Sequence, residues 1–384
     1  MATVKKRKWT TGKGEQREAW VFAWTDAQGK RHKEQFPLKR DAEARRTEIS
    51  HKVSTGTFRA EAATKTVKDA IDEYIKHLEA RHSKGESVTT MYLRNTSAQL
   101  RTHVQPELGS VKLSQLTARS VNELGSSLRA ADVGLITVRR TIGSLSRALA
   151  HAIAKDWVAT NAAVGVRIIG KRGEGSEKVV PPTKAALTAL LAAADDDMKR
   201  RIQFAAATGL RASEQWALRW RHLDLTGRKL TVETRVDAFG EFDTTKSDSG
   251  KRTVPLGKTT AADLAKWRKE SKFKGEEDFV FPDSAGGFTR HTNFLRRKLS
   301  PLLEAAAEKE KSEGRKFNPV GWHALRHFAV SKWIEAGLQP KAIQTLAGHA
   351  TYAITMDRYG HMFPSDDHAN AMDAISETLF ADGA

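Results

Sequence analysis

The amino-acid sequence predicts a multidomain chain: a small α+β module at the N-terminus, an all-α bundle after it, and a mixed α+β domain in the C-terminal half. Length is the first reason, because 384 residues exceed one ordinary domain. Patterning is the second: residues 66–81 repeat apolar side chains at helical spacing, whereas 230–256 holds short β-type runs separated by turns. Between them, 168–180 is rich in Gly and charged residues, the composition of a linker.

The first part, residues 1–60, is predicted to form a three-stranded sheet plus a helix. Residues 17–24 and 31–36 have strand composition, and 26–29 (DAQG) supplies a turn between them. Residues 39–52 are typical of a charged helix. Lys and Arg outnumber acidic residues here, and tryptophans interleave with them, which favours a folded DNA-binding sheet over a solvated basic tail.

The second part, residues 66–160, is predicted to be a compact helical bundle. Its helices are expected at 66–81, 87–103, 117–129 and 135–155, with breaks at 106–109 (PELG) and 133–134. An interdomain linker is expected at 161–182, and its last two residues are prolines. The polar residues of the bundle suit phosphate contact and plain solvation equally, so this part alone indicates no function.

The third part, residues 183–384, mixes helices with short strands. Three strands are expected at 230–233, 242–245 and 252–256, joined by turns. Helices are expected at 184–194, 197–208, 259–269, 292–312 and 322–336. A further helix is predicted in the tail, at 366–380, because Met372, Ile375 and Leu379 recur at helical spacing.

Composition excludes several classes of function. The chain has no cysteine, which excludes disulfides, thiolate metal sites and a cysteine nucleophile and is compatible with a reducing cytoplasm. No apolar run approaches the roughly 20 residues of a membrane span, and the basic N-terminus lacks the apolar core of a signal peptide. The net charge of +18 favours a polyanionic partner, nucleic acid above all, over coincidental basicity.

The stretch 322–362 concentrates groups that suit one anionic substrate. His323 and Arg326 are three residues apart, so they share one face of the predicted helix. A Gly-His pair ending at His349 follows, and Tyr359 comes ten residues after that histidine. Arg offers a planar fork that matches phosphate, His moves a proton near neutral pH, and Tyr can act as a covalent nucleophile. Together they indicate an oxygen-rich substrate such as a phosphodiester.

Two further pieces precede that stretch. Arg211 begins RASE, in which Glu214 lies one helical turn later, and Lys246 lies in TTKSDSGKRTVPL. With the residues just described, six polar positions now stand in order: Arg211, Lys246, His323, Arg326, His349 and Tyr359. Their order, spacing and surroundings resemble the tyrosine recombinase (phage integrase) family, over about residues 183–363.

The resemblance implies a domain plan and an activity. Residues 66–160 look like the helical core-binding domain of that family, 1–60 like the arm-binding domain of phage-type integrases, and 183–384 like its mixed α+β catalytic domain. The activity implied is site-specific DNA recombination by the integrase of a phage or an integrative mobile element. The family conserves the phosphodiester energy in a protein–DNA bond, so neither ATP nor a metal or other cofactor is expected.

The implied chemistry centres on Tyr359, which would attack a DNA phosphate, release a 5′-hydroxyl and leave a 3′-phosphotyrosyl bond. Arg211 and Arg326 would hold the non-bridging oxygens and stabilise charge that gathers at phosphorus. Glu214 is expected to be a buried support for Arg211. The alternative for Arg211 and Glu214 is a simple surface ion pair within one helical turn, the commoner fate of that spacing.

Three further residues complete the implied site. His323 is expected to be the acid/base partner of the tyrosine, and Lys246 would give a proton to the leaving 5′-oxygen. His349 would hydrogen-bond a phosphate oxygen. Lys251 lies in the same loop as Lys246 and is the alternative for its role.

Neighbouring residues are expected to be structural. Tyr352 lies only three residues after the histidine of the Gly-His pair, but the spacing of ten and the YGH that ends it favour Tyr359 as nucleophile. His327 and Trp322 flank the motif and are expected to pack or buttress it. The family often has an acid at the position of Ala324 and a larger apolar residue at that of Ala347; neither position supplies a reacting group.

The resemblance also implies partners: double-stranded DNA attachment sites and a homo-tetramer assembled on DNA, with a host DNA-bending protein and an excisionase as further candidates. The tail helix 366–380 is a candidate for docking on a neighbouring protomer. The expected location is the cytoplasm of a bacterial host, with the nucleoid and without membrane attachment. Two rivals remain open: a type IB topoisomerase, and a basic DNA-binding regulator or architectural protein without catalytic activity.

Overall fold

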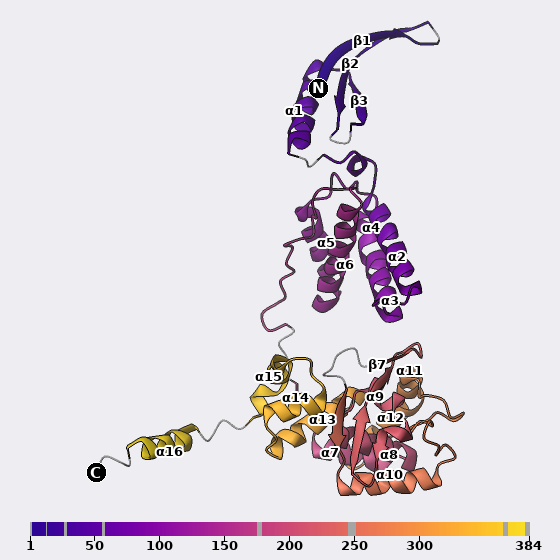
Figure 1. Cartoon of the computed structure of the whole chain (residues 1–384), viewed down its shortest axis with the longest axis vertical. Helices are drawn as coiled ribbons and strands as arrows, with labels where there is room; N and C mark the ends of the chain where they lie inside the picture. The colour runs from indigo at the N-terminus through magenta and orange to yellow at the C-terminus, as the bar shows by residue number, and fades with distance from the viewer. Residues whose placement is uncertain are drawn as a thin grey trace. The chain divides into compact units, whose positions relative to one another are not determined.

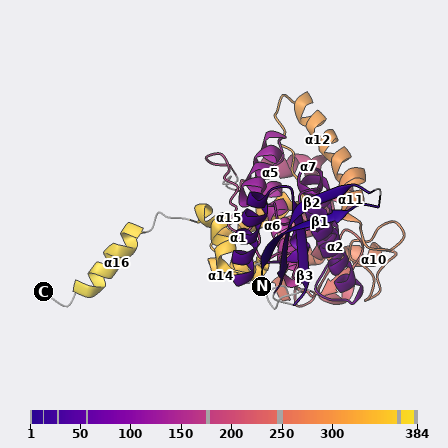
Figure 2. The ribbon, with the colours of Figure 1, turned by 90° about the horizontal axis from the view of Figure 1, so that it is seen from above.

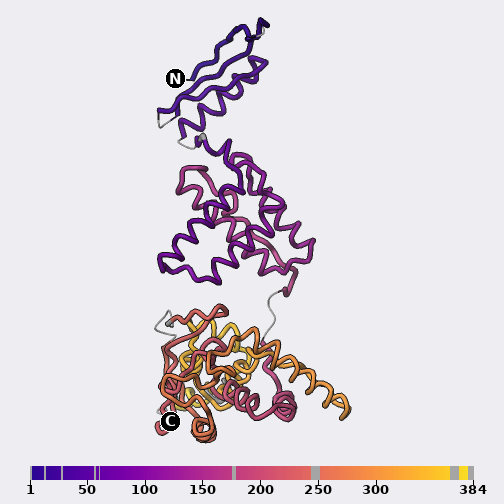
Figure 3. The backbone as a smooth tube through the Cα atoms, turned by 90° about the vertical axis from the view of Figure 1, so that its right-hand side faces the viewer, coloured from indigo at the N-terminus to yellow at the C-terminus, as the bar shows by residue number. Residues whose placement is uncertain are grey.

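The structure, a computed structural model, describes residues 2–12, 14–26, 29–55, 58–174, 179–244, 251–363 and 368–380. The chain divides into two compact units, Met1–Ser176 and Glu177–Ala384 (Figure 1). Figure 3 follows the backbone of each unit as a tube. The predicted fold class is confirmed, because a small sheet module, a helical bundle and a mixed α+β region follow one another along the chain. The finer domain boundaries stay predictions.

The N-terminal module is an antiparallel sheet with one helix packed on it. Its strands β1 (Thr3–Thr10), β2 (Gln16–Thr25) and β3 (Arg31–Phe36) pair in that order, and α1 (Lys39–Ser54) lies along the sheet (Figures 1 and 2). Alternation along β2 turns Phe22 and Trp24 inward, where they pack with Ile49 of α1. Trp24 stacks on Phe22 with 4.6 Å between ring centroids. It is therefore a core residue and not part of a DNA-contacting surface.

The helical bundle begins at a capped helix. Thr66 precedes α2, and its hydroxyl accepts from the Asp69 backbone N–H while the Asp69 carboxylate accepts from the Thr66 N–H at 2.8 Å. The apolar stripe predicted for this helix is buried. The helices are α2 (Val67–Ser83), α3 (Thr90–Gln99), α4 (Gln105–Leu108), α5 (Ala118–Ala130) and α6 (Leu135–Ala154).

One predicted break in the bundle starts later than expected. The helix expected to stop at residue 103 continues through a π-helical turn, Leu100–Val104, into α4, and ends only after Leu108. Pro106 lies in the first turn of α4. A proline has no N–H to donate and so removes one intrahelical hydrogen bond, and the π-helical turn just before it changes the local hydrogen-bond register.

The stretch 161–174, predicted to begin the linker, packs against the bundle. Ala163 is buried, and Ile168 contacts the core of the bundle. The Arg139 guanidinium donates to the Ile168 carbonyl at 3.0 Å, and Arg129 pairs with Glu174 at 2.6 Å. Apolar and ionic contacts thus attach this Gly-rich, basic stretch to the first unit.

Unit 2 combines helices with two small antiparallel sheets. The strands pair as β4-β5-β8 and β6-β7; they are β4 (Leu223–Asp224), β5 (Lys229–Val232), β6 (Thr234–Val236), β7 (Phe242–Thr244) and β8 (Arg252–Pro255). The helices are α7 (Lys184–Ala193), α8 (Asp196–Thr208), α9 (Ala212–Ala217), α10 (Lys258–Glu270), α11 (His291–Phe294), α12 (Ser300–Ser312), α13 (Trp322–Glu335), α14 (Pro340–Ala347), α15 (Tyr352–Tyr359) and α16 (His368–Phe380). A π-helical turn, Leu295–Leu299, joins α11 to α12.

An aromatic cluster fixes the start of α13 in the core of unit 2. Trp322 stacks on Trp216 with 5.4 Å between centroids and meets Phe294 edge-on at 4.7 Å. Trp322 therefore packs, as predicted, and sets the position of the helix that follows it. The tail helix is present as α16, with Met372 and Ile375 exposed. Across the part of the chain that the structure describes, no helix is long and apolar enough to cross a membrane.

Candidate active site

Arg211 lies at a turn between two helices of unit 2. Gly209 ends α8 in the left-handed conformation, with φ of 61°, and Arg211 immediately precedes α9. Glu214, in the first turn of α9, accepts from the Arg211 backbone N–H at 2.9 Å and from its guanidinium at 2.7 Å. The arginine is half-buried and the glutamate is 4% exposed. The ion pair predicted as the structural alternative exists, but its acid is inside the protein.

A second guanidinium reaches the same carboxylate from β8. Arg252 donates to both oxygens of Glu214, at 2.8 and 3.1 Å, and to the Leu346 carbonyl at 2.8 Å. Both partners of this pair are buried. Burial raises the pKa of Glu214, but the hydrogen bonds and charge of Arg252, with the charge of Arg211, outweigh it and lower that pKa to about 2. The carboxylate is therefore ionised at neutral pH.

Arg326 is the most buried of the predicted phosphate ligands. It extends from α13 and is 3% exposed, and it donates to the carbonyls of Gly209 at 2.7 Å and Ala347 at 2.5 Å. Arg211 donates likewise to the Gly348 carbonyl at 2.7 Å. Burial and the positive charge of Arg211 lower the pKa of Arg326 to about 9, which leaves it cationic at neutral pH.

Cations outnumber acids among the described residues of this cluster. There, the guanidiniums of Arg211, Arg252 and Arg326 lie around one carboxylate, that of Glu214. A buried excess of positive charge is costly unless an anion completes it. Backbone carbonyls orient the guanidiniums before any ligand arrives, so the cluster is a preorganised anion site.

A glycine at the end of α14 lets the next chain segment close over the cluster. Gly348 has φ of 65°, and a Cβ there would lie 2.8 Å from a guanidinium nitrogen of Arg252. His349 follows and is buried; its Nδ1 is 2.9 Å from the Thr355 hydroxyl. Burial and the nearby arginines lower the pKa of His349 to about 3, so it is neutral at pH 7. In the tautomer whose Nδ1 accepts from the Thr355 hydroxyl, Nε2 has the hydrogen and can donate it to a ligand oxygen.

Tyr359 ends α15 in a closed environment. Its side chain is 0% exposed and packs with Val330 and Ile343. The His349 ring stacks over it, with 6.1 Å between centroids. Burial raises the pKa of the phenol, although the charges of nearby arginines oppose the shift. Tyr352, the predicted decoy, begins the same helix and is 47% exposed.

The two histidines of α13 differ in their contact with Tyr359. His327 Nδ1 lies 2.6 Å from the Tyr359 hydroxyl. His323, predicted as the partner of the tyrosine, is exposed, and between these described residues no hydrogen bond joins it to Tyr359. The two imidazole rings meet at right angles, 4.8 Å between centroids. His327 was predicted only to pack; its position one helical turn after His323 was the signal that it shares that face.

The lysine of the site falls outside the described residues. Lys246 lies in the stretch 245–250, about which the structure says nothing. Its alternative, Lys251, is exposed, with Nζ 3.4 Å from a Glu233 carboxylate oxygen. Among described residues, no group of three or more His, Asp or Glu side chains is placed to hold a metal ion.

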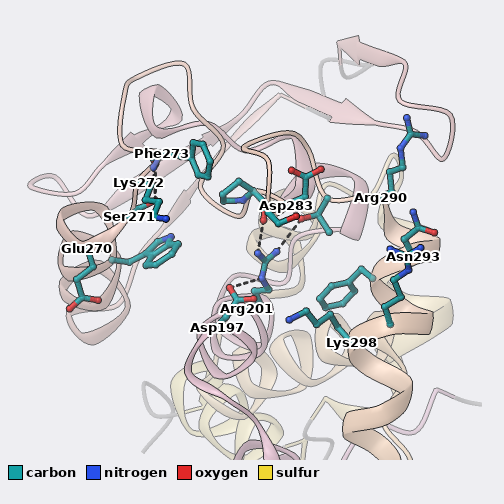
Figure 4. Close-up of a pocket in the computed structure, with 16 residues that line it drawn as sticks. Asp197, Arg201, Glu270, Ser271, Lys272, Phe273, Asp283, Arg290, Asn293 and Lys298 are labelled. Atoms are coloured by element: carbon teal, nitrogen blue, oxygen red, sulfur yellow. Dashed lines mark hydrogen bonds and ion pairs between the residues drawn. The ribbon is translucent and has the colours of Figure 1, made fainter.

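A pocket of about 640 Å³ lies elsewhere in unit 2 and contains none of the predicted site residues (Figure 4). Arg201 projects into it but is already bonded to Asp197 at 2.9 Å, to the Pro282 carbonyl and to Thr289. Cations outnumber acids along this pocket too, but its buried arginine is already paired with a neighbouring carboxylate and with backbone oxygen.

Comparison with known proteins gives a consistent result. Residues 183–365 match the model of the phage integrase family. The chain is 26% identical to a tyrosine recombinase XerC-like protein of Caldanaerobacter subterraneus over 203 residues, which are 47% of this chain and 49% of that protein. It is 32% identical to tyrosine recombinase XerC of Xanthomonas axonopodis over 149 residues, 39% and 42% of the two chains. It is 29% identical to the Tn916 transposase of Enterococcus faecalis over 170 residues, 40% of each. The chain thus spans about half or less of these relatives.

Solved structures share the fold. An integrase of transposon Tn1549 in complex with circular intermediate DNA gives a TM-score of 0.65 at 21% identity and covers 81% of this chain and 99% of its own. A lambda integrase tetramer bound to a Holliday junction gives 0.56 at 17% identity, over 90% and 95% of the two chains.

Proposed function

Because its residues 183–365 make the chain a member of the phage integrase family of tyrosine recombinases, we propose that it is a site-specific DNA recombinase. It would act for a phage or an integrative mobile element and cleave DNA through a 3′-phosphotyrosyl intermediate. One observation supports this most strongly: a buried tyrosine lies next to a preorganised excess of guanidinium charge. A phosphodiester satisfies both, because it supplies the missing anion and the electrophile.

In the proposed reaction, the Tyr359 oxygen forms a bond to phosphorus and the bond from phosphorus to the 5′-oxygen breaks. Arg211 and Arg326 hold the non-bridging oxygens, and His349 donates to one of them from Nε2. Glu214 positions Arg211, and His323 takes part in acid/base catalysis at the tyrosine. Lys246 protonates the leaving 5′-oxygen. Because Tyr359 is 0% exposed, a DNA phosphate reaches it only when apolar side chains packed on the phenol move, while the contact of the phenol with His327 is retained.

The domain roles follow from the same proposal. Residues 1–60 bind arm-type DNA sites, 66–160 bind the core site, 161–182 link the units, and 183–384 contain the catalytic site. The partners are attachment-site DNA and three further copies of the chain. We include the tail helix in this assembly: the exposed apolar residues of α16 suit docking on a neighbouring protomer. A host DNA-bending protein and an excisionase are the accessory factors proposed.

The test is covalent capture. A DNA substrate from the junction of the element, nicked near the core site so that the cleaved end diffuses away, is incubated with wild-type protein, Tyr359→Phe and the matched control Tyr352→Phe. Wild type and Tyr352→Phe should form a protein–DNA adduct, and Tyr359→Phe none. An adduct that disappears only in Tyr352→Phe would move the nucleophile, and tight binding without any adduct would favour a non-catalytic DNA-binding protein. Relaxation of plasmids without a junction sequence would favour a topoisomerase.

A further inference from the structure

The closest polar contact of the proposed nucleophile is to a residue outside the six-residue set. His327 Nδ1 and the Tyr359 hydroxyl are 2.6 Å apart, a short hydrogen bond. The rings are 5.7 Å apart between centroids and tilted by 53°, so the contact runs through the nitrogen and not through stacking. His327 is half-buried, whereas His323 is exposed.

The surroundings of Tyr359 make a proton acceptor necessary. A phenol has a pKa of about 10 in water, and burial raises it further here. A side chain that is 0% exposed has no contact with bulk water, so solvent cannot take the proton directly. A base has to be within hydrogen-bond reach of the nucleophile, and His327 is.

The imidazole of His327 is neutral and therefore able to accept. Burial, then the charges of His323, Arg358 and Arg326, lower its pKa to about 4. Those groups, with Tyr359, come from the two helices that surround it, α13 and α15. With its hydrogen on Nε2, the ring presents the Nδ1 lone pair to the phenol.

We propose that His327 is a catalytic residue that takes the phenolic proton of Tyr359 as its oxygen attacks phosphorus. The proposal rests on the proposed recombinase function. The O–H bond of the phenol breaks while the oxygen–phosphorus bond forms, the proton moves to Nδ1, and the imidazole becomes imidazolium. The leaving 5′-oxygen takes its proton from another group. In rejoining, the 5′-hydroxyl attacks, and His327 returns the proton to the departing phenol.

Substrate binding strengthens this base. A phosphate held by Arg326 brings negative charge to the helix that contains His327, and it offsets the cations that hold the imidazole pKa low. The base would thus gain basicity only when the phosphodiester is in place. Attack on a phosphodiester that is out of register is disfavoured by the same arrangement.

Two variants of His327 separate proton transfer from positioning. His327→Asn keeps a hydrogen-bonding atom near the position of Nδ1 but cannot hold a proton, and His327→Leu removes the contact. His323→Asn measures separately the part that the proposed function gives to the other histidine of this helix face. Each full-length protein is tested for core-DNA binding and for single-turnover cleavage of the nicked substrate between pH 6 and 9. A second substrate has sulfur at the bridging 5′ position, where the leaving group departs without a proton.

We expect both His327 variants to bind DNA but to cleave on the order of 10²-fold more slowly on either substrate. Their rates should climb steadily with pH as hydroxide replaces the base, while the wild-type rate levels off. Wild-type rates in His327→Asn would overturn the proposal in favour of positioning. Rescue by the sulfur substrate would assign His327 to the leaving group, and faster cleavage by His327→Leu would make the contact a restraint; both contradict the proposal. No adduct from wild type would count against the recombinase function itself.

Discussion

The two units of the chain bury polar groups of different kinds. In the described part of unit 1, the buried polar residues are Thr96, Thr141 and Ser144, and the largely buried Asp26 carboxylate is matched by His32 at 2.6 Å. In unit 2 they include ionisable groups, namely Arg201, Glu214, His222, Arg252, Arg326 and His349. Both units have aliphatic cores, so the hydrophobic effect accounts for folding in each.

The difference shows what the charges of unit 2 are for. Folding alone gains little from a buried ion pair, because desolvation offsets most of the attraction. Among the described residues around Glu214, three guanidiniums and one carboxylate are partly or fully removed from water. An arrangement with unmatched charge is explained by a ligand that supplies the opposite charge, and unit 1 has no counterpart among its described residues.

The largest expected effect is at Glu214, the buried acid among the described residues of the cluster. Glu214→Gln removes the carboxylate that accepts from Arg252 and that offsets the charge of Arg326, and we expect it to lower the free energy of unfolding by about 3–5 kcal/mol. Urea unfolding of the full chain measures the change in the free energy of unfolding, and hydrogen exchange shows whether unit 2 is the part that is destabilised. Glu277→Gln is the matched control: Glu277 also pairs with two arginines, Arg219 and Arg221, but is exposed, so its loss should stay within about 0.5 kcal/mol.

The same residue predicts a pH dependence. The folded-state pKa of Glu214, about 2, is below its ordinary value of 4.5. Its ionisation therefore contributes stability that is fully present above pH 4.5, roughly 3 kcal/mol, and that is lost as pH falls from 4.5 towards 2. The free energy of unfolding of the wild type should therefore fall by this amount between pH 4.5 and pH 2, whereas that of Glu214→Gln should not show this part of the pH dependence. Equal losses in Glu214→Gln and Glu277→Gln would contradict the account of a ligand-directed charge cluster.

An intermediate effect is expected at Gly348. Gly348→Ala combines an unfavourable left-handed backbone with a collision against Arg252. Gly337→Ala also places an alanine in the left-handed region, with φ of 79°, but the added Cβ would meet no atom within 4 Å. Gly337→Ala should cost about 1 kcal/mol and leave cleavage unchanged, whereas Gly348→Ala should cost more and slow cleavage. Identical behaviour of the two variants would show that the guanidinium position is unimportant.

The smallest effect is expected in unit 1. The buried Thr141 hydroxyl has no hydrogen-bond partner among the described residues, so Thr141→Val should be neutral or stabilise the unit by about 1 kcal/mol. Ser144→Ala is the contrast, because the Ser144 hydroxyl bonds to Gln99 at 2.7 Å and to Arg147 at 2.9 Å. Hydrogen exchange of unit 1 measures both. Strong destabilisation by Thr141→Val would mean that polar groups matter in this core too.

Sequence periodicity predicted the elements that bury long apolar stripes, such as α2, because their spacing is local information. It did not place α9, α14 or α15, since helices of six to eight residues show too few repeats. Arg252 was missed because its partner is 38 residues away. The sequence did hold a signal for its burial, because Arg252 and Val254 are two residues apart in a strand and therefore point to the same, buried face of β8. A charge at an inward position of a strand calls for a buried partner.

The central claim is that unit 2 places Tyr359 beside an anion site as the nucleophile. Identifying the modified residue in the covalent adduct tests it most directly. Trypsin cuts after Arg358, so Tyr352 and Tyr359 belong to different peptides, and tandem mass spectrometry locates the nucleotide remnant. The account predicts the remnant on Tyr359. A remnant on Tyr352, or on a residue of unit 1, would contradict it.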